Sequence, residues 1–306
     1  MIKIDINQHK FEKYIATIGN FDGLHLGHVK LLSNMSQYAT QNNLGRLIIT
    51  FEPLTHEFLC IAKKTEVQSR LSLIRDKIRY IQGQKLADKV LIIRFNREMM
   101  SLSPHQFIHK ITDKFSLDTV MVGHDFKFGY KTSGTILDFS KENINTLLCD
   151  DFLIESNKAS STNIRELLSN NKLDKAYAML GHSLCYTSRV VKGNQLGRKF
   201  GVPTINLNLG FRRPAVWGVY FAYVHIEGNR YNAVASIGKN PTVSDSEYYK
   251  LEAHLIDVNM DLYGKIATIE FLEFLRPELK FNNLDELFVA IADDLLQTRK
   301  FFAEKI

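Results

Sequence analysis

Two histidines stand in a glycine-rich stretch near the start of the chain, at residues 19–28, which read Gly-Asn-Phe-Asp-Gly-Leu-His-Leu-Gly-His. The apolar run 14–18 before it predicts a buried strand, and the helical spacing of apolar residues over 31–39 predicts a helix after it. Backbone N–H groups at a helix N-terminus favour a phosphate, and glycine lets a backbone approach a ligand closely. The imidazoles of His25 and His28 could hydrogen-bond the same anion, so the stretch predicts a nucleotide triphosphate site.

Two further segments of the first half carry groups suited to a ligand. Residues 122–129, Val-Gly-His-Asp-Phe-Lys-Phe-Gly, follow a predicted strand, and residues 160–165, Ser-Ser-Thr-Asn-Ile-Arg, open a predicted helix. Hydroxyls and N–H groups at a helix start, with an arginine one turn in, form an anion site. The plainer alternatives are a serine N-cap at 160–165 and a simple glycine turn with exposed histidines at 19–28.

The second half of the chain has a glycine-rich stretch of its own, residues 193–206, which ends in Pro-Thr-Ile-Asn. A later segment, 251–255, reads Leu-Glu-Ala-His-Leu and carries Glu252. A glycine-rich stretch taken alone is often only a turn, and a glutamate on a strand is usually solvated. These two segments indicate chemistry only in combination with the rest of the sequence.

The elements around these segments change in kind along the chain. The first 180 residues alternate strands with helices, which predicts a parallel sheet with helices on both faces and ligands beyond the carboxyl ends of the strands. From about Gly181, short strands separated by Gly, Asn and Pro turns favour a small antiparallel barrel, closed by a helix. We expect an α/β protein with a doubly wound parallel-sheet domain over 1–182 and a β-barrel domain with a terminal helix over 183–306.

Composition narrows the class of protein. Hydrophobic residues make up 45% and charged residues 24% of the chain, as in a globular protein. No apolar run has the length of a membrane span, and residues 1–5 lack an apolar signal core, so we expect a cytoplasmic protein with no membrane partner. Cys60, Cys149 and Cys185 are too far apart to favour a disulfide framework or a cysteine zinc site. The net charge of +6 suits nucleotide ligands.

Taken together, these segments resemble the bacterial bifunctional riboflavin kinase/FMN adenylyltransferase (FAD synthetase) family. Residues 19–28 match its Gly-x-Phe-Asp-Gly-x-His-x-Gly-His pattern at every specified position. Residues 122–129 resemble its Val-Gly-x-Asp-Phe-x-Phe-Gly, and 160–165 its Ser-Ser-Thr-x-Ile-Arg. Residues 193–206 resemble the kinase stretch that ends in Pro-Thr-Ala-Asn. Further ordered matches to kinase segments are 218–220, 237–242, 251–255 and 262–265.

The resemblance implies two ATP-dependent reactions: riboflavin is phosphorylated to FMN in 183–306, and FMN is adenylylated to FAD with release of pyrophosphate in 1–182. It implies that Glu252 accepts the proton of the ribityl hydroxyl and that His25 and His28 act on the phosphates in adenylyl transfer. Mg²⁺, bound with ATP, would be held by Thr204 and Asn206. The implied ATP-binding residues are Gly19, Phe21, Gly27, Ser161, Thr162, Arg165, Gly193, Gly197, Arg198, Pro203, Thr204 and Asn206, and the implied flavin-binding residues are Asp125 and Phe126.

Three departures from the family pattern leave rates and affinities open: Ile205 replaces the usual Ala, Ser236 replaces the usual Asn, and Asn163 stands where a basic residue is frequent. Three alternatives remain. A different adenylyl- or cytidylyltransferase shares the His-x-Gly-His turn but does not account for the second half. A nucleic-acid-binding protein would interleave basic and aromatic residues on strands, which the sequence does not, so we expect no nucleic-acid partner. One half could also be an inactive regulatory scaffold.

Overall fold

The chain forms two compact units. The computed structural model describes residues 1–154, 157–193, 201–210, 212–240, 248–258 and 260–305. By contacts, the first unit comprises 1–68 and 77–160, and the second comprises 69–76 and 161–306. Residues 161–182, which we expected within the first domain, therefore group with the second unit. The assignment of each activity to 1–182 or 183–306 stays a prediction.

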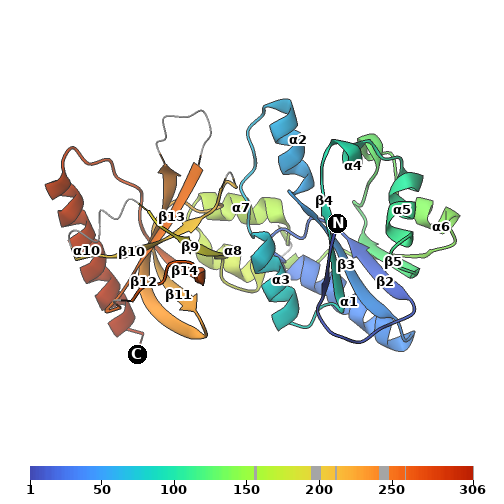
Figure 1. Ribbon diagram of the computed structural model, residues 1–306, viewed down its shortest axis with the longest axis horizontal. Helices are drawn as coiled ribbons and strands as arrows, with labels where there is room; N and C mark the ends of the chain where they lie inside the picture. Colours follow the sequence, from blue (N-terminus) through green and yellow to red (C-terminus); the bar gives the residue numbers. More distant parts are fainter. Residues whose placement is uncertain (155–156, 194–200, 211, 241–247, 259, 306) are drawn as a thin grey trace. The chain divides into compact units, whose positions relative to one another are not determined.

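The first unit is built on a mixed sheet with the strand order β1-β4-β3-β2-β5-β6 (Figure 1). Its strands are β1 Ile2–Asp5, β2 Tyr14–Ile18, β3 Gly45–Glu52, β4 Lys89–Arg94, β5 Leu117–Gly123 and β6 Asn145–Cys149. All neighbouring pairs are parallel except β1 with β4, which is antiparallel. The predicted parallel sheet is confirmed, and the structure adds an antiparallel edge strand, a common feature of such sheets.

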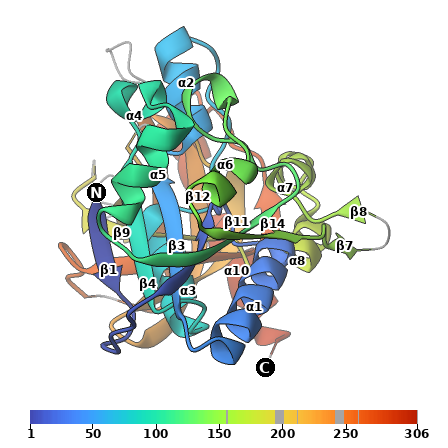
Figure 2. The same cartoon turned by 90° about the vertical axis from the view of Figure 1, so that its right-hand side faces the viewer.

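Helices cover both faces of this sheet. They are α1 Leu26–Gln41, α2 Thr55–Lys63, α3 Ile74–Gly83, α4 Arg97–Ser101, α5 Pro104–Thr112, the 3₁₀ turn η1 Tyr130–Thr132 and α6 Leu137–Lys141. On one face, Phe107 and Ile111 of α5 and Phe139 of α6 pack with Ile18 and Ile49 of the strands. Helix α1 contacts β2, β3 and β5 and lies on the opposite side from α5 (Figure 2). Every residue of β2 is buried, as expected for a strand covered on both faces.

The sheet register brings two of the predicted ligand segments together. Strands β2 and β5 are parallel neighbours, so their carboxyl ends meet at the same edge of the sheet. The turn 19–25 follows β2 and the segment 124–129 follows β5. Beyond β6, the short strands β7 Leu153–Ile154 and β8 Asn157–Lys158 pair with each other.

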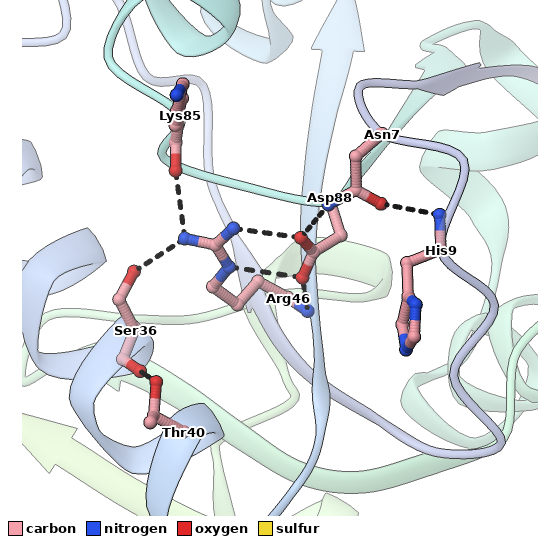
Figure 3. Close-up of polar contacts among 7 residues, drawn as sticks. All are labelled: Asn7, His9, Ser36, Thr40, Arg46, Lys85 and Asp88. Atoms are coloured by element: carbon pink, nitrogen blue, oxygen red, sulfur yellow. Dashed lines mark hydrogen bonds and ion pairs between the residues drawn. The ribbon is translucent and has the colours of Figure 1, made fainter.

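A hydrogen-bond network fixes the opposite, amino ends of β3 and β4 (Figure 3). Arg46 donates from Nε and Nη2 to both carboxylate oxygens of Asp88, at 3.1 and 2.8 Å, and Asn7 donates to the same carboxylate. Nη1 of Arg46 also donates to Ser36 Oγ on α1 and to the Lys85 carbonyl. Burial alone would raise the pKa of Asp88, but the hydrogen bonds from Arg46 hold it below its usual value. The network therefore joins α1, β3 and β4 away from the ligand edge.

The second unit contains a closed antiparallel barrel with the strand order β10-β13-β12-β11-β14-β9, as the sequence predicts. The strands are β9 Cys185–Val191, β10 Thr204–Asn208, β11 Gly218–Ile226, β12 Asn229–Asn240, β13 Tyr248–Leu255 and β14 Ile266–Arg276. Residues such as Tyr220, Ala235, Leu251 and Ile269 alternate inward along their strands and form one apolar core.

This core extends beyond the barrel to elements that precede it in the sequence. Helices α7 Ser161–Ser169 and α8 Leu173–Leu180 contribute buried leucines and an isoleucine, and segment 69–76 contributes two leucines. The Tyr177 hydroxyl donates to the Phe271 carbonyl at 2.8 Å, and burial raises the pKa of Tyr177. The Tyr186 hydroxyl donates to the Arg70 carbonyl at 2.7 Å. These contacts explain why 69–76 and 161–182 belong to the second unit.

The terminal helix α10 Leu284–Ala303 packs on the barrel. Asn283 caps its N-terminus by accepting from the Glu286 N–H, and Phe301 stacks on Phe221 of β11 with ring centroids 4.1 Å apart. Arg276, the last residue of β14, donates to both carboxylate oxygens of Asp294 at 2.7 Å. None of the helices in the described part of the chain, α10 included, is long and apolar enough to cross a lipid bilayer.

Candidate active sites

The turn between β2 and α1 is a strained loop held by burial. Phe21, Gly23 and Leu24 all have positive φ angles, and two of these residues are not glycine. The side chains of Phe21 and Leu24 are almost completely buried, which offsets the backbone strain. A Cβ at Gly27 would lie 2.9 Å from the Ala159 carbonyl oxygen and 3.1 Å from His25 Nδ1. Glycine at 27 therefore serves the close approach of the 159 backbone to the start of α1.

The two histidines of this turn stack on each other. The ring centroids of His25 and His28 are 3.7 Å apart, and the Phe21 ring meets His28 edge-on at 5.1 Å. Burial lowers the pKa of His28 well below its ordinary value, with further contributions from His25 and Lys77. Nδ1 of His28 is buried and has no hydrogen-bond partner among the described residues. The free imidazole is therefore neutral near pH 7, and its buried nitrogen lacks a partner that a ligand could supply.

Lys77 of α3 holds the backbone of this turn through a hydrogen bond, a role that the sequence analysis did not predict. Its side chain is buried, and its ammonium donates to the Asn20 carbonyl at 2.7 Å. Thr50 at the end of β3 donates to the same carbonyl at 3.2 Å. A buried lysine is rare because its charge must be compensated. Nothing in the sequence marks Lys77 as buried, because it lies on an ordinary amphipathic helix, where a lysine is usually exposed to solvent.

A cavity of about 240 Å³ opens over the turn. Every residue that we predicted as a site residue in segments 19–28 and 122–129 lines this cavity: Gly19, Phe21, His25, Gly27, His28, Asp125 and Phe126. Phe126 stacks on Phe128 with ring centroids 5.4 Å apart, so it presents an aromatic face at the rim. The structure thus brings the histidines and the predicted flavin-side residues into one site.

The same cavity contains a charged cluster that the sequence analysis missed. Lys158 of β8 forms ion pairs with Asp125 at 2.8 Å and with Asp151 at 2.9 Å, and the pKa of Asp125 is lowered by the hydrogen bond from this lysine. His124 pairs with Asp150 at 3.1 Å. The only feature of the sequence that could have pointed to Lys158 is its position three residues before Ser161, next to the predicted ligand segment 160–165.

The third predicted phosphate segment opens α7, in the second unit. Ser161 and Thr162 form its first turn, and Arg165 follows one turn in, as predicted. The Arg165 Nε donates to the Ser69 carbonyl at 2.6 Å. Whether these three residues and the histidines bind one triphosphate stays a prediction.

Three predicted kinase residues lie on two paired strands of the barrel. In the antiparallel register of β10 with β13, Asn206 is opposite Glu252 and Thr204 is opposite His254. Directly opposite residues project to the same side of a sheet, so a hydroxyl, an amide and a carboxylate face one surface. Lys250 forms an ion pair with Glu252 at 2.8 Å. The sequence analysis assigned Pro203, Thr204 and Asn206 to ligand binding, but it did not predict that Thr204 and Asn206 lie on a strand.

Two cavities meet at Thr204. The smaller, about 100 Å³, is lined by Gly193, Pro203, Thr204 and Asn206, and the larger, about 300 Å³, includes Thr204 and Glu252. A Cβ at Gly193 would overlap the Asn206 side-chain amide, so only glycine permits this backbone approach. Asn206 is only 8% exposed. Gly197 and Arg198, which we also predicted to bind ATP, lie outside the described residues.

The larger cavity is closed on one side by the segment that leads into α10. Glu278 lies so close to Gly238 that a Cβ there would overlap its carboxylate, and burial raises the pKa of Glu278. His254 lines the same cavity; it shares a hydrogen bond of 2.8 Å between Nδ1 and the Pro203 carbonyl, and burial lowers its pKa. Glu278 and His254 were not predicted as site residues.

Comparison with known proteins links both sites to one family. The family model for FAD synthetase matches residues 7–163, and the Flavokinase (riboflavin kinase) model matches residues 180–302. The crystal structure of a macrolide-efflux protein from Streptococcus pneumoniae is 27% identical, covers 96% of this chain and 97% of its own, and has a TM-score of 0.73. That likeness concerns the fold.

Curated relatives align over nearly their whole length. A bifunctional riboflavin kinase/FMN adenylyltransferase from Buchnera aphidicola subsp. Schizaphis graminum is 36% identical over 94% of this chain and 93% of the relative. The protein of that name from Escherichia coli K12 is 35% identical over 97% of this chain and 96% of its own. Since both family models match in order and these relatives span the chain, the chain belongs to the bifunctional riboflavin kinase/FMN adenylyltransferase family.

Proposed function

We propose that the two activities of this family, riboflavin kinase and FMN adenylyltransferase, reside in separate sites of this chain. ATP and riboflavin give FMN and ADP at the β10–β13 surface, and ATP and FMN give FAD and pyrophosphate at the cavity over the β2–α1 turn. The observation that carries this proposal is the cross-strand placement of Asn206 against Glu252, with Thr204 beside them, on the barrel. The stacked histidines line a different cavity in the other unit.

In the kinase reaction, Glu252 accepts the proton of the ribityl 5′-hydroxyl while that oxygen attacks the γ-phosphorus of ATP and ADP leaves. The carboxylate of Glu252 lies beside the larger cavity, where a flavin has room next to Thr204. Phosphoryl transfer depends mainly on positioning and on stabilising the charge of the phosphates. Lys250, paired with Glu252, contributes positive charge at the same edge.

The residues at this edge fit Mg²⁺. Thr204 and Asn206 supply a hydroxyl oxygen and an amide oxygen, which are hard ligands of the kind Mg²⁺ prefers, and the remaining ligands of such an ion are usually phosphate oxygens and water. When bound, Mg²⁺ neutralises charge on the ATP phosphates. Gly193 keeps the backbone against Asn206 and so fixes the orientation of its amide.

In the adenylyltransferase reaction, a phosphate oxygen of FMN attacks the α-phosphorus of ATP, and pyrophosphate leaves. The substrate itself is the nucleophile, so the chain needs to orient the two phosphates and to stabilise their charge. His25 and His28 donate hydrogen bonds to the phosphates, with Gly19, Phe21 and Gly27 shaping the turn around them. Asp125 and Phe126 line the flavin side of the same cavity.

The phosphate-binding role of α7 is part of this proposal. Ser161 and Thr162 offer hydroxyls and main-chain N–H groups at a helix N-terminus, and Arg165 adds a positive charge one turn later. Together they are suited to the phosphates of ATP. Arg165→Ala should then raise the KM for ATP in FAD formation.

The activity test is a time course with purified chain, riboflavin and Mg·ATP, in which riboflavin, FMN and FAD are separated and quantified. FMN should form first and FAD should follow with consumption of FMN. With Glu252→Gln, FMN formation should fall by ~10²–10⁴-fold, as is typical when general-base catalysis is lost. The same variant should still convert supplied FMN to FAD. If it phosphorylates riboflavin at the parent rate, the role of Glu252 is wrong.

A further inference from the structure

A second constellation in the first unit has the donor set of a metal site and takes no part in the two proposed reactions. His105 and His109 are four residues apart on α5, so their imidazoles project from one face of that helix. Glu142 follows the last residue of α6, and its carboxylate faces both rings. Helices α5 and α6 lie side by side in both views (Figures 1 and 2).

The distances are those of ligands that share one ion. The Nε2 atoms of His105 and His109 are 3.0 Å apart, and each lies 3.5 Å from an oxygen of Glu142. Two nitrogens bound to one Zn²⁺ at its usual bond length are separated by about 2.9–3.4 Å, depending on the bond angle. One ligand atom from each of the three residues lies within 4.8 Å of the others. A small side-chain adjustment completes a three-ligand site.

The surroundings hold these ligands in place. Ser103 and Gln106 form a capping box at the start of α5, and the apolar face of the helix is buried in the core of the unit. The lysines of these two helices pair with other carboxylates: Lys110 of α5 pairs with Glu98 at 2.7 Å, and Lys141 of α6 pairs with Asp138 at 2.7 Å. The histidine side chains are 68% and 49% exposed, so a hydrated ion reaches them directly.

We propose that His105, His109 and Glu142 form a binding site for a divalent transition metal such as Zn²⁺, separate from the Mg²⁺ bound with ATP. Two imidazoles and one carboxylate suit Zn²⁺, Co²⁺, Ni²⁺ or Cu²⁺, whereas Mg²⁺ prefers oxygen ligands and resists losing water. Without a metal, His105 and His109 share a hydrogen bond and both rings lie 3.5 Å from the Glu142 carboxylate, and this is the alternative that the test must exclude.

The site has a mechanical consequence for the first unit. Residues 124–136 connect β5 to α6 and carry Asp125 and Phe126 of the first cavity. Pro104, at the start of α5, packs closely enough on Gly129 and Gly134 that a Cβ on either would lie about 3 Å from it. A metal that joins α5 to the end of α6 restrains this segment, and it stabilises the folded chain because it binds that state.

The test uses the full chain without a polyhistidine tag, stripped of metal by a chelator and kept in excess Mg²⁺. Titration with Co²⁺, followed by its visible absorption, and with Zn²⁺, followed by calorimetry, should show one equivalent bound and a rise in the unfolding temperature. His109→Ala and Glu142→Gln should each weaken binding by at least about tenfold, since even indirect partners of a metal contribute about that much.

The matched control is His9→Ala, which removes one exposed histidine of the same unit and should bind metal like the parent. Unfolding of each variant without metal should match the parent, and Glu142→Gln covers the case in which His109→Ala folds poorly. Failure of the parent to bind Zn²⁺ in excess Mg²⁺ overturns the proposal. So does binding that survives both substitutions but is lost in His28→Ala, because the ion would then lie at the stacked histidines.

Discussion

Burial sets the protonation of single residues at both proposed sites. It lowers the pKa of His28 and of His254, so both imidazoles are neutral near pH 7, and it raises the pKa of Glu278. A neutral imidazole donates one hydrogen bond without the cost of a buried cation. The site without ligand therefore carries less positive charge than two protonated histidines would supply. A phosphate that binds beside His28 favours the protonated form of its ring.

The first prediction concerns a proton at His28. A triphosphate beside the ring favours its charged form and raises its pKa, so ATP binding to the first cavity should take up a proton and become tighter as the pH falls toward about 6. Calorimetry at one pH, in buffers of different ionisation enthalpy, measures that uptake. The uptake should be absent in His28→Ala and unchanged in His9→Ala. Equal uptake in the parent and in His28→Ala would assign the proton to another group.

Gly193→Ala tests the second cavity at a single atom. The new Cβ would overlap the Asn206 amide, so the amide must turn away from its position beside Thr204. We expect riboflavin phosphorylation to fall by at least about tenfold, because small displacements of positioning groups are costly to rate. FAD formation from supplied FMN should be unaffected. Gly83→Ala is the control, since a Cβ there meets nothing within 4 Å, and an active Gly193→Ala enzyme would contradict the geometry.

Individual elements show where sequence patterns suffice. The five parallel strands of the sheet were predicted because each contains a short apolar run, whereas the edge strand β1, Ile-Lys-Ile-Asp, was not predicted. The antiparallel barrel was predicted from its regular turns. Residues 147–154, Leu-Leu-Cys-Asp-Asp-Phe-Leu-Ile, are apolar enough at both ends to suggest one strand, but β6 ends at Cys149 and β7 begins at Leu153. Asp150 and Asp151 stand in the break, and apolar residues on both sides of them make the segment resemble one strand when only periodicity is considered.

The site residues fall into two groups, those that stand in a recognisable motif and those that do not. His25, His28, Thr204, Asn206 and Glu252 stand in ordered motifs, so their positions were predictable. Their partners were not, because Lys77, Lys158 and Glu278 are charged residues without a motif, and charged residues are usually solvated. Only the packing of distant segments shows that a lysine of α3 reaches the carbonyl of the β2–α1 turn.

The Arg46–Asp88 network predicts a specific loss of stability. Asp88→Asn removes a buried charged partner of Arg46, and we expect a loss of about 2 kcal/mol in the free energy of unfolding at pH 7. Because the folded pKa of Asp88 is lowered, its contribution is present above the unfolded pKa and disappears as the pH falls below about 4. Urea unfolding of parent and variant at pH 7 and pH 3 measures both effects.

The control for this network is Glu98→Gln, which removes an exposed ion pair with Lys110 in the same unit. Exposed pairs contribute little, so this variant should unfold nearly like the parent. If Asp88→Asn is no more costly than Glu98→Gln, or if the difference persists at pH 3, the network does not hold β3 and β4 as described.

At the scale of the whole molecule, the boundary between the two units differs according to whether it is drawn from sequence patterns or from contacts. Local patterns place the change of architecture near residue 180, and the first family model ends at residue 163 while the second begins at residue 180. Contacts place 161–182 and 69–76 with the barrel. A segment of the first half that packs in the second unit leaves no local trace in the sequence, so this part of the organisation could not be predicted.

A pair of fragments tests which residues complete the second unit. A fragment 183–306 lacks Tyr177, whose hydroxyl donates to Phe271, and it lacks the buried leucines and the isoleucine that α7 and α8 contribute to the barrel core. We expect a fragment 161–306 to unfold at a higher temperature, because it retains those contacts and the area they bury. Circular dichroism during heating compares the two. Equal unfolding temperatures would show that α7 and α8 do not stabilise the barrel.

The central claim is that one chain carries two independent sites, and mixing two inactive variants tests it most directly. Glu252→Gln should make FMN ~10²–10⁴-fold more slowly than the parent, and the double variant His25→Ala, His28→Ala should make FMN but little FAD. Supplied together with riboflavin and Mg·ATP, the two should form FAD, because FMN released by the double variant is adenylylated by Glu252→Gln. FAD in the mixture, with little in either variant alone, is the predicted result. No FAD in the mixture, or parent-like FAD from either variant alone, would contradict the account.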